Sequence, residues 1–178
     1  MEPPKLTLAE RRAKRELRRA KQREANIGRA ASMHAARLAD PTTYPAAQAG
    51  SDLAASVPSY HIGCSGWFYW HWRDIFYPSS VPTKNWFGHY ASRFNTVELN
   101  APFYSWPTVA NVNSWLRQAG RKNFVYTVKA CELITHVKRF SGTKKLVEDF
   151  GYIADLLGPR MGCFLFQLPP SYHYSQPR

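Results

Sequence analysis

Between residues 60 and 168 the sequence alternates between short strand-like runs and longer helical patterns. The strand-like runs are YHIGCS (60–65), NTVELN (95–100), NFVYTVKA (123–130) and CFLFQL (163–168). Apolar residues recur at helical spacing over 82–94, 107–120 and 142–158, and the last two patterns close on Gly120 and Gly158. Strands that alternate with such helices are typical of βαβ units and a parallel sheet. We therefore predict an α/β fold.

Each strand-like run places apolar and polar residues on opposite faces, because successive residues of a strand point to opposite sides. In the second run, Glu98 and Asn100 share the face that the apolar residues leave. Lys129 and Gln167 have the same parity in the third and fourth runs, and both lie near the carboxyl end of their run. Polar residues at such ends form the active sites of (β/α) barrels and of open α/β sheets. We therefore expect these four residues to share one face, with Lys129 close enough to reach Glu98.

Residues 1–40 form a different region, which is helix-prone and strongly basic. Thr7 and Glu10 are spaced as a capping box at a helix start, and eight of the thirteen residues 11–23 are Lys or Arg. The few apolar residues make no continuous stripe, so we expect this helix to bury no face of its own. The region is either an arm for nucleic acid or acidic surfaces, or a solvated or disordered extension. Residues 41–59 have the composition of a linker, and residues 60–178 form the predicted barrel-like domain.

The chain carries a formal net charge of +12, which is spread over both regions. A charge of this size favours polyanionic partners, either nucleic acid through the basic extension or a small phosphorylated ligand; a solvated basic surface is the alternative. The three cysteines, Cys64, Cys131 and Cys163, match neither a disulfide framework nor a zinc site. No apolar run is long enough to span a bilayer, and the N-terminus lacks the apolar core of a signal peptide. We therefore expect a cytoplasmic protein with no membrane partner.

Four blocks of the sequence resemble, in the same order, blocks of the YecE-like family, which is domain of unknown function 72 (DUF72). The blocks are IGCSGWFYWHWRDIFYP (62–78), FNTVELNAPFYSWP (94–107), FVYTVKACELITH (124–136) and LGPRMGCFLFQLPPSY (157–172). The resemblance implies a TIM-barrel-like fold, distantly akin to sugar isomerases and other metal-assisted barrel enzymes, and supplies no assigned reaction. A complete barrel has eight strands in about 250 residues. We therefore expect an apparently truncated barrel of about the first four strands, which self-associates or needs a partner half-barrel.

The resemblance also singles out individual positions. The matching residues are Gly63, Ser65, Gly66, Trp67, Tyr69, Glu98, Asn100, Phe103, Tyr104, Lys129, Thr135, His136, Gln167, Pro169 and Pro170. Ala101 and Pro102 depart from the pattern, because the family usually has small hydroxyl residues there. We therefore expect the loop after Asn100 to have a different shape in this chain.

Three residues are candidates for catalysis. Glu98 suits a general base or a ligand of a divalent metal, and Lys129 suits a Schiff-base amine or a clamp on a carbonyl or phosphate oxygen. His136 suits a general acid or a substrate donor. The structural alternatives are an ion pair between Glu98 and Lys129 and a loop histidine bonded to the backbone. One carboxylate and one histidine are too few for a complete metal site, so we predict no metal, and the sequence identifies no cofactor.

Residues 67–77 contain seven aromatic side chains. They form either a stacking wall for a sugar or nucleobase, or an apolar plug over the first strand. We expect Trp67 and Tyr69 to face a pocket and most of the others to pack inside. The candidate substrate-binding residues are Ser65, Trp67, Tyr69, Asn100, Tyr104 and Gln167.

Three functions remain as alternatives at this point. The first is a barrel enzyme that acts on a sugar, a sugar phosphate or a related polar metabolite. The second is a nucleic-acid-binding or nucleic-acid-processing protein, which would use the basic extension and the aromatic segment. The third is an inactive gene fragment. The sequence leaves open whether the chain is an enzyme.

Overall fold

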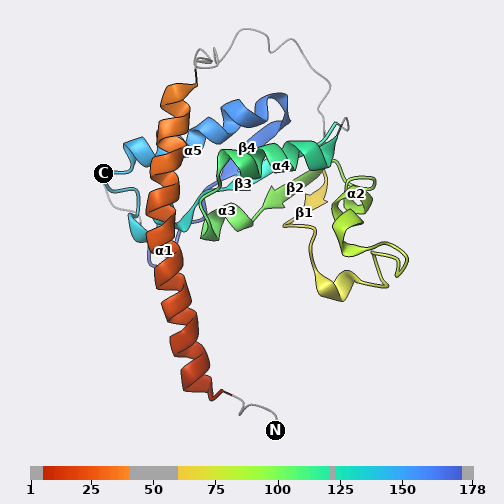
Figure 1. Ribbon diagram of the computed structural model, residues 1–178, viewed down its shortest axis with the longest axis horizontal. Helices are drawn as coiled ribbons and strands as arrows, with labels where there is room; N and C mark the ends of the chain where they lie inside the picture. The colour runs from red at the N-terminus through yellow and green to blue at the C-terminus, as the bar shows by residue number, and fades with distance from the viewer. Residues whose placement is uncertain (1–5, 41–59, 121–122, 174–178) are drawn as a thin grey trace.

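The computed structural model of the protein describes residues 6–40, 60–120 and 123–173 (Figure 1). Its centre is a sheet of four parallel strands in the order β1-β2-β3-β4. The strands are β1 (Gly63–Cys64), β2 (Thr96–Leu99), β3 (Val125–Lys129) and β4 (Met161–Leu165). Each strand overlaps its predicted run. The α/β class with a parallel sheet is therefore confirmed.

The described residues form five α-helices around this sheet. They are α1 (Leu8–Ala39), α2 (Trp86–Tyr90), α3 (Ala101–Tyr104), α4 (Val109–Ala119) and α5 (Lys144–Leu157). Gly120 ends α4 with a φ of 59°, and Gly158 ends α5 with a φ of 54°. Both helices therefore end at the glycines that the sequence indicates. None of the helices in the described part of the chain is long and apolar enough to cross a membrane.

Three segments differ from the helices predicted from the sequence. Of the segment 82–94, only α2 is α-helical, and a 3₁₀ turn at Thr83–Asn85 precedes it. The sequence does not predict α3, because four residues are too few for a periodic pattern. The π-helix at Leu133–Val137 is also unpredicted.

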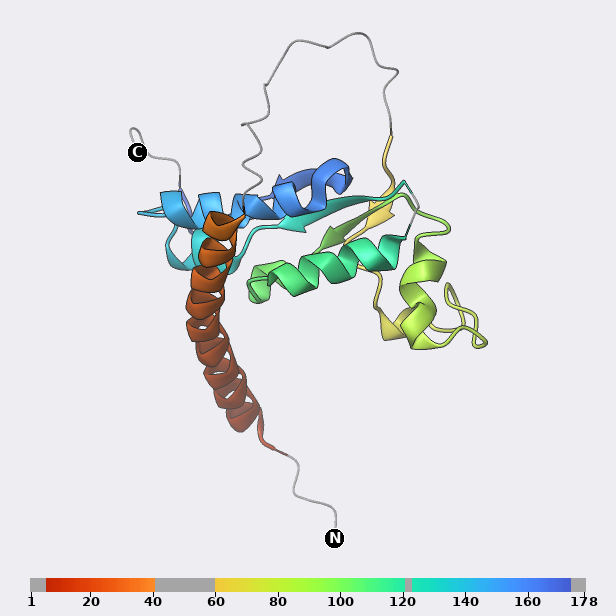
Figure 2. The same ribbon diagram turned by 45° about the horizontal axis from the view of Figure 1, so that its top comes forward.

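The core lies between the sheet and the helices α2, α4 and α5, and Figure 2 shows α4 running alongside the strands. Phe87 of α2 stacks near Tyr126 of β3, with 6.4 Å between the ring centroids. The Tyr126 hydroxyl donates to the backbone carbonyl of Trp115 in α4 at 2.7 Å. Phe150 of α5 lies 5.6 Å from Phe164 of β4. These rings bind the three helices to one face of the sheet.

The opposite face of the sheet carries the polar residues, as the alternation predicts. In β2, Val97 and Leu99 are buried, whereas Glu98 is half-buried. The alternation continues in β3, where Lys129 is half-buried. Glu98 pairs in register with Thr127. Glu98 and Lys129 therefore lie on the same, more open face of the sheet.

Half of α1 packs on the rest of the protein, and this corrects the sequence-based expectation. Residues 6–21 are exposed and extend away from the body, but Asn26, Ala30 and Met33 are buried (Figure 1). These three residues recur at helical spacing and form one narrow stripe. The expectation that the helix buries no face is wrong, because a stripe containing an amide and an alanine is missed when only large apolar residues are followed. The predicted capping box between Thr7 and Glu10 is confirmed.

Charged contacts also hold α1 in place. His34 Nδ1 lies 2.8 Å from Asp149 Oδ1, and Arg37 Nε donates to the same oxygen at 3.0 Å. Arg23 pairs with Glu132 at 3.3 Å. The extension is therefore helical over Leu8–Ala39 and not disordered there. The division into extension, linker and barrel-like domain stays a prediction, and the predicted linker 41–59 lies outside the described residues.

Candidate functional site

The side chains of Ser65 and Glu98 meet at the carboxyl ends of β1 and β2. Ser65 follows the last residue of β1, and its hydroxyl donates to Glu98 Oε2 at 2.7 Å. Both side chains remain in contact with solvent. The carboxylate is thus held by a neutral donor and stays accessible, as the position of a general base requires.

Tyr69 fixes the turn that carries Ser65. Its hydroxyl donates to the backbone carbonyl of Ser65, and its ring lies 4.7 Å from the ring of Trp72. Gly66 has a φ of 100°, and a Cβ at this position would lie 3.2 Å from the Tyr69 hydroxyl. Glycine is therefore required both by the backbone angle and by the close approach of the tyrosine. The result is a closed turn that positions Ser65 against Glu98.

Most of the aromatic segment 67–77 packs as an apolar plug. The ring of Trp67 meets Phe87 edge-on at 4.9 Å, and Tyr77 stacks on Trp86 at 4.3 Å. Trp67, expected to face a pocket, is thus packed against the core. Two other rings, which were expected to pack inside, are exposed instead. They lie at the surface, with exposed fractions of 50% for Phe68 and 62% for Trp70.

Lys129 lies on the same face as Glu98, but the two side chains do not form an ion pair. The Lys129 Nζ lies 4.8 Å from the centroid of the Phe103 ring, which belongs to α3. Among the described residues, no ion pair within 4.0 Å includes Lys129 or Glu98. Because Glu98 is in register with Thr127, Lys129 is its diagonal neighbour, one side-chain step further along β3. The structural alternative of an ion pair between Glu98 and Lys129 is therefore not seen among the described residues, and Lys129 makes a cation–π contact instead.

Phe103 connects Lys129 with His136. The imidazole of His136 meets the Phe103 ring edge-on at 5.0 Å, and its Nδ1 lies 2.9 Å from Thr135 Oγ1. His136 belongs to the π-helix that follows β3, and such helices are frequent at functional sites. Phe103 is absent from the predicted site residues. Its match in the second family block is the signal that could have identified it.

Two other predicted residues, Asn100 and Tyr104, adjoin Phe103. Asn100 precedes α3, and its backbone carbonyl accepts a hydrogen bond from the Phe103 N–H at 3.1 Å. Tyr104 is 54% exposed, with its ring 4.9 Å from that of Phe103. Gln167 is exposed beyond β4. The structure thus assembles two groups at the carboxyl ends of the strands: Ser65, Tyr69 and Glu98 in the first, and Phe103, Lys129 and His136 in the second.

Together the two groups present a carboxylate, an ammonium and an imidazole on one side of the sheet. Within the described ranges, no three His, Cys, Asp or Glu side chains come together as a possible metal site. A carboxylate and an ammonium that do not neutralise each other can act on one ligand, because the first accepts a proton and the second stabilises a negative oxygen. The arrangement therefore suits acid–base chemistry on a polar molecule.

Comparison with known proteins identifies a family that matches this chain. The family model described as "Protein of unknown function DUF72" matches residues 61–178. The match includes all four strands and both groups of side chains. Comparisons with curated proteins and with solved structures gave no match.

Proposed function

The chain belongs to the DUF72 family of proteins of unknown function, and we propose that it catalyses proton transfer on a sugar or sugar phosphate. Glu98 removes a proton from the carbon next to the substrate carbonyl. Lys129 stabilises the negative charge that then develops on the carbonyl oxygen. The same proton, or one from solvent, returns to the carbon chain, so the step needs no oxidant or reductant.

The hydrogen bond between Ser65 and Glu98 carries this proposal. A hydroxyl donor fixes the carboxylate without an adjacent cation, which would hold it in its charged form and weaken it as a base. Because the described residues provide Glu98 with no ion-pair partner, its oxygens remain available to a substrate. The carboxyl ends of parallel strands are also the usual place for such a group.

The surroundings of Lys129 support the second role. Its ammonium lies over the face of Phe103, so an aromatic ring and not a carboxylate holds it. A substrate oxygen that becomes negative would therefore meet an ammonium that no carboxylate neutralises. His136, on the edge of the same ring, provides a donor for a second substrate oxygen.

We further propose that residues 60–178 belong to a (β/α) barrel. The supporting observation is the sequential order of four parallel strands with helices on one face, which is the arrangement of consecutive barrel strands. In a barrel, the face with Glu98 and Lys129 is the inner face.

Exchange of carbon-bound hydrogen with solvent tests the proposed reaction. The full chain is incubated in D₂O with glucose, fructose and their 6-phosphates, and deuterium incorporation next to the carbonyl is followed by NMR. We expect incorporation into at least one probe. Glu98→Gln should slow it roughly 100- to 10,000-fold, the usual contribution of a general base, and Lys129→Met should also slow it strongly.

Glu16→Gln on the exposed part of α1 is the matched control, and it should exchange at the unsubstituted rate. Circular dichroism verifies that each variant is folded. The proposal fails if no probe exchanges with the unsubstituted protein, or if folded Glu98→Gln exchanges as fast as the control.

A further inference from the structure

An arginine-lined groove lies between the N-terminal half of α1 and α3. Its walls are Arg15, Arg18, Arg19 and Gln22 on one side and Ala101, Tyr104 and Ser105 on the other, and its volume is about 460 Å³. We infer that this groove and the exposed half of α1 bind single-stranded nucleic acid. The inference goes beyond the proposed reaction and does not rest on it.

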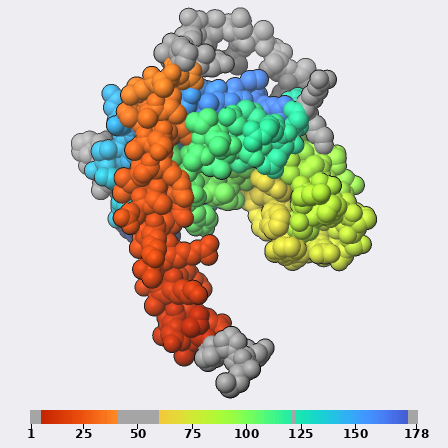
Figure 3. Space-filling view, in the orientation of Figure 1, coloured from red at the N-terminus to blue at the C-terminus, as the bar shows by residue number. Residues whose placement is uncertain are grey.

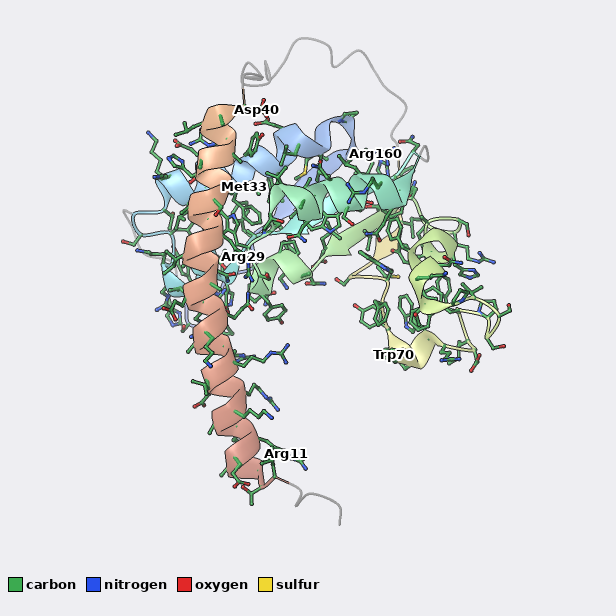
Figure 4. The ribbon with its side chains drawn as sticks, in the orientation of Figure 1. Arg11, Arg29, Met33, Asp40, Trp70 and Arg160 are labelled. Carbon is green, nitrogen blue, oxygen red and sulfur yellow. The ribbon has the colours of Figure 1, made fainter. Side chains whose placement is uncertain are left out.

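The helix period turns the arginines toward the groove. At steps of three or four residues, Arg15, Arg18 and Gln22 continue the stripe on which Asn26 and Met33 are buried. The side of α1 that packs on the protein through Asn26 and Met33 therefore carries the guanidinium groups of Arg15 and Arg18 in the turns nearer the N-terminus. Figure 4 shows this half of α1 extending past α3, with Arg11 near its start.

Among the described residues, no acidic side chain forms an ion pair with the arginines of the groove. In the described ranges, the ion pairs of α1 involve Arg23, His34 and Arg37, and none involves an arginine of the groove. A helix segment of the length of 11–22 extends over about 18 Å. A fixed row of cations of that length matches the repeated charges of a polyanionic chain better than it matches a single phosphate.

Exposed aromatic rings determine the form of nucleic acid that fits. Tyr104 lines the groove and is 54% exposed. Figure 3 shows a hollow between the exposed half of α1 and the segment that follows β1, and Figure 4 places Trp70 on the segment's side of it. Such rings stack on bases that are unpaired, whereas a duplex keeps its bases in its own stack. The rings therefore favour a single strand over a duplex.

A membrane surface fits the same helix less well. Between residues 9 and 26, Leu17 is the one large apolar residue in the sequence. Helices that lie in a membrane interface bury an apolar face in addition to their contacts with anionic lipid. The exposed half of α1 has no such face, so charge alone would hold it to a bilayer.

Fluorescence anisotropy tests the inference with a labelled oligouridine of about 15 nucleotides, long enough for a typical single-strand site. The full chain is titrated at several salt concentrations. The key variant is Arg15→Gln with Arg18→Gln. The matched control is Lys14→Gln with Lys21→Gln, which removes the same charge from the same exposed segment but from positions outside the groove.

We expect the groove variant to bind at least about tenfold more weakly, and to lower the slope of log affinity against log salt by about 1.4, which is 0.7 for each lost phosphate contact. The control should lose less than a third of that slope. Tyr104→Ala should weaken binding about 5- to 150-fold, the range for one stacked base, with little change in the slope.

Three results would overturn the inference. The first is no binding of oligouridine by the unsubstituted protein at low salt. The second is an equal loss of affinity in the groove variant and the control, which would show a diffuse charge effect. The third is tighter binding to a duplex of the same length or to phosphatidylserine vesicles, which would assign the surface to another partner. Circular dichroism of each variant excludes loss of the helix as the cause.

Discussion

The side-chain carbonyl of Asn26 accepts a hydrogen bond from the backbone N–H of Trp106 at 2.9 Å. The amide nitrogen of the same side chain donates to the backbone carbonyl of Tyr104 at 3.0 Å. Asn26 is completely buried. One side chain of α1 thus satisfies two backbone groups, one in the last residue of α3 and one just after it, and it connects the basic helix to the part of the chain that follows β2.

Replacing Asn26 with alanine should destabilise the protein. The substitution leaves a backbone N–H and a backbone carbonyl without their partners, and each loss costs about 1–3 kcal/mol. We expect the free energy of unfolding to fall by roughly 2–6 kcal/mol, measured by urea denaturation. Glu24→Ala is the control, because Glu24 is exposed on the same helix, and its effect should stay within about 0.5 kcal/mol. A change of that small size for Asn26→Ala would show that α1 is not attached through this residue.

Gly63→Ala should disrupt the pairing of β1 with β2. Gly63 is in register with Thr96, and a Cβ on Gly63 would lie 2.0 Å from the Thr96 backbone oxygen. The strand would have to move, so we expect a loss of roughly 2–3 kcal/mol in the free energy of unfolding. Ser65, just after β1, would move with it.

Gly151→Ala in α5 provides the contrasting substitution. Apart from its chain neighbours and the backbone of its own helix, no atom of the described residues lies within 4 Å of the position of the added Cβ, and alanine is the better helix former. This variant should be more stable by about 0.5–1 kcal/mol. Thermal unfolding compares the two variants. If the melting temperatures of Gly63→Ala and Gly151→Ala shift in the same direction, the close approach of β1 to β2 does not limit the residue at position 63.

The stability of the protein should fall in alkaline solution because of Cys131. Burial raises the pKa of its thiol from 9.0 to about 11. The folded protein therefore keeps a proton that the unfolded chain releases, so this contribution is complete below pH 9 and is lost as the pH rises through 11. The slope should approach about 1.4 kcal/mol per pH unit for one proton.

Urea unfolding at several pH values measures this slope between pH 9 and 10, before the buried tyrosines contribute. Burial raises the pKa of Tyr90 and of Tyr152 to about 12, so their contribution is lost only above pH 10. Cys131→Ala should flatten the slope, whatever its effect on stability at neutral pH. Cys163→Ala is the control, because Cys163 is exposed. An unchanged slope in Cys131→Ala would refute the assignment.

The sequence predicts the elements of the sheet well, because each strand and each long helix has a local signal. Alternation identifies β2 and β3, and a glycine marks the end of both α4 and α5. The placement of Glu98 and Lys129 on one face follows from parity alone. The lack of an ion pair between them does not follow from parity, because it depends on strand register and on Phe103, which lies in a helix too short to be detected.

The docking of α1 has no local signal in the sequence. Its buried stripe contains Asn26 and Ala30, which are not large apolar residues. Nothing in the sequence distinguishes its charged partner Asp149 from an exposed acidic residue. Asp149 is 1% exposed in the structure because His34 and Arg37 surround its carboxylate. Contacts of this kind depend on tertiary structure, so a residue-by-residue pattern cannot reveal them.

The distance along the chain between α1 and its partners sets an order of events during synthesis. Tyr104 comes 78 residues after Asn26, and Asp149 comes 115 residues after His34. At about 5–20 residues per second, the ribosome needs roughly 4–23 s to make these 78 to 115 residues. The basic helix is therefore made before its partners and can dock only once they exist, and until then Asn26 and Met33 are open to water and to other molecules. The time for which the buried stripe of α1 stays exposed on the nascent chain is thus set by how late Asp149 and the backbone partners of Asn26 are translated.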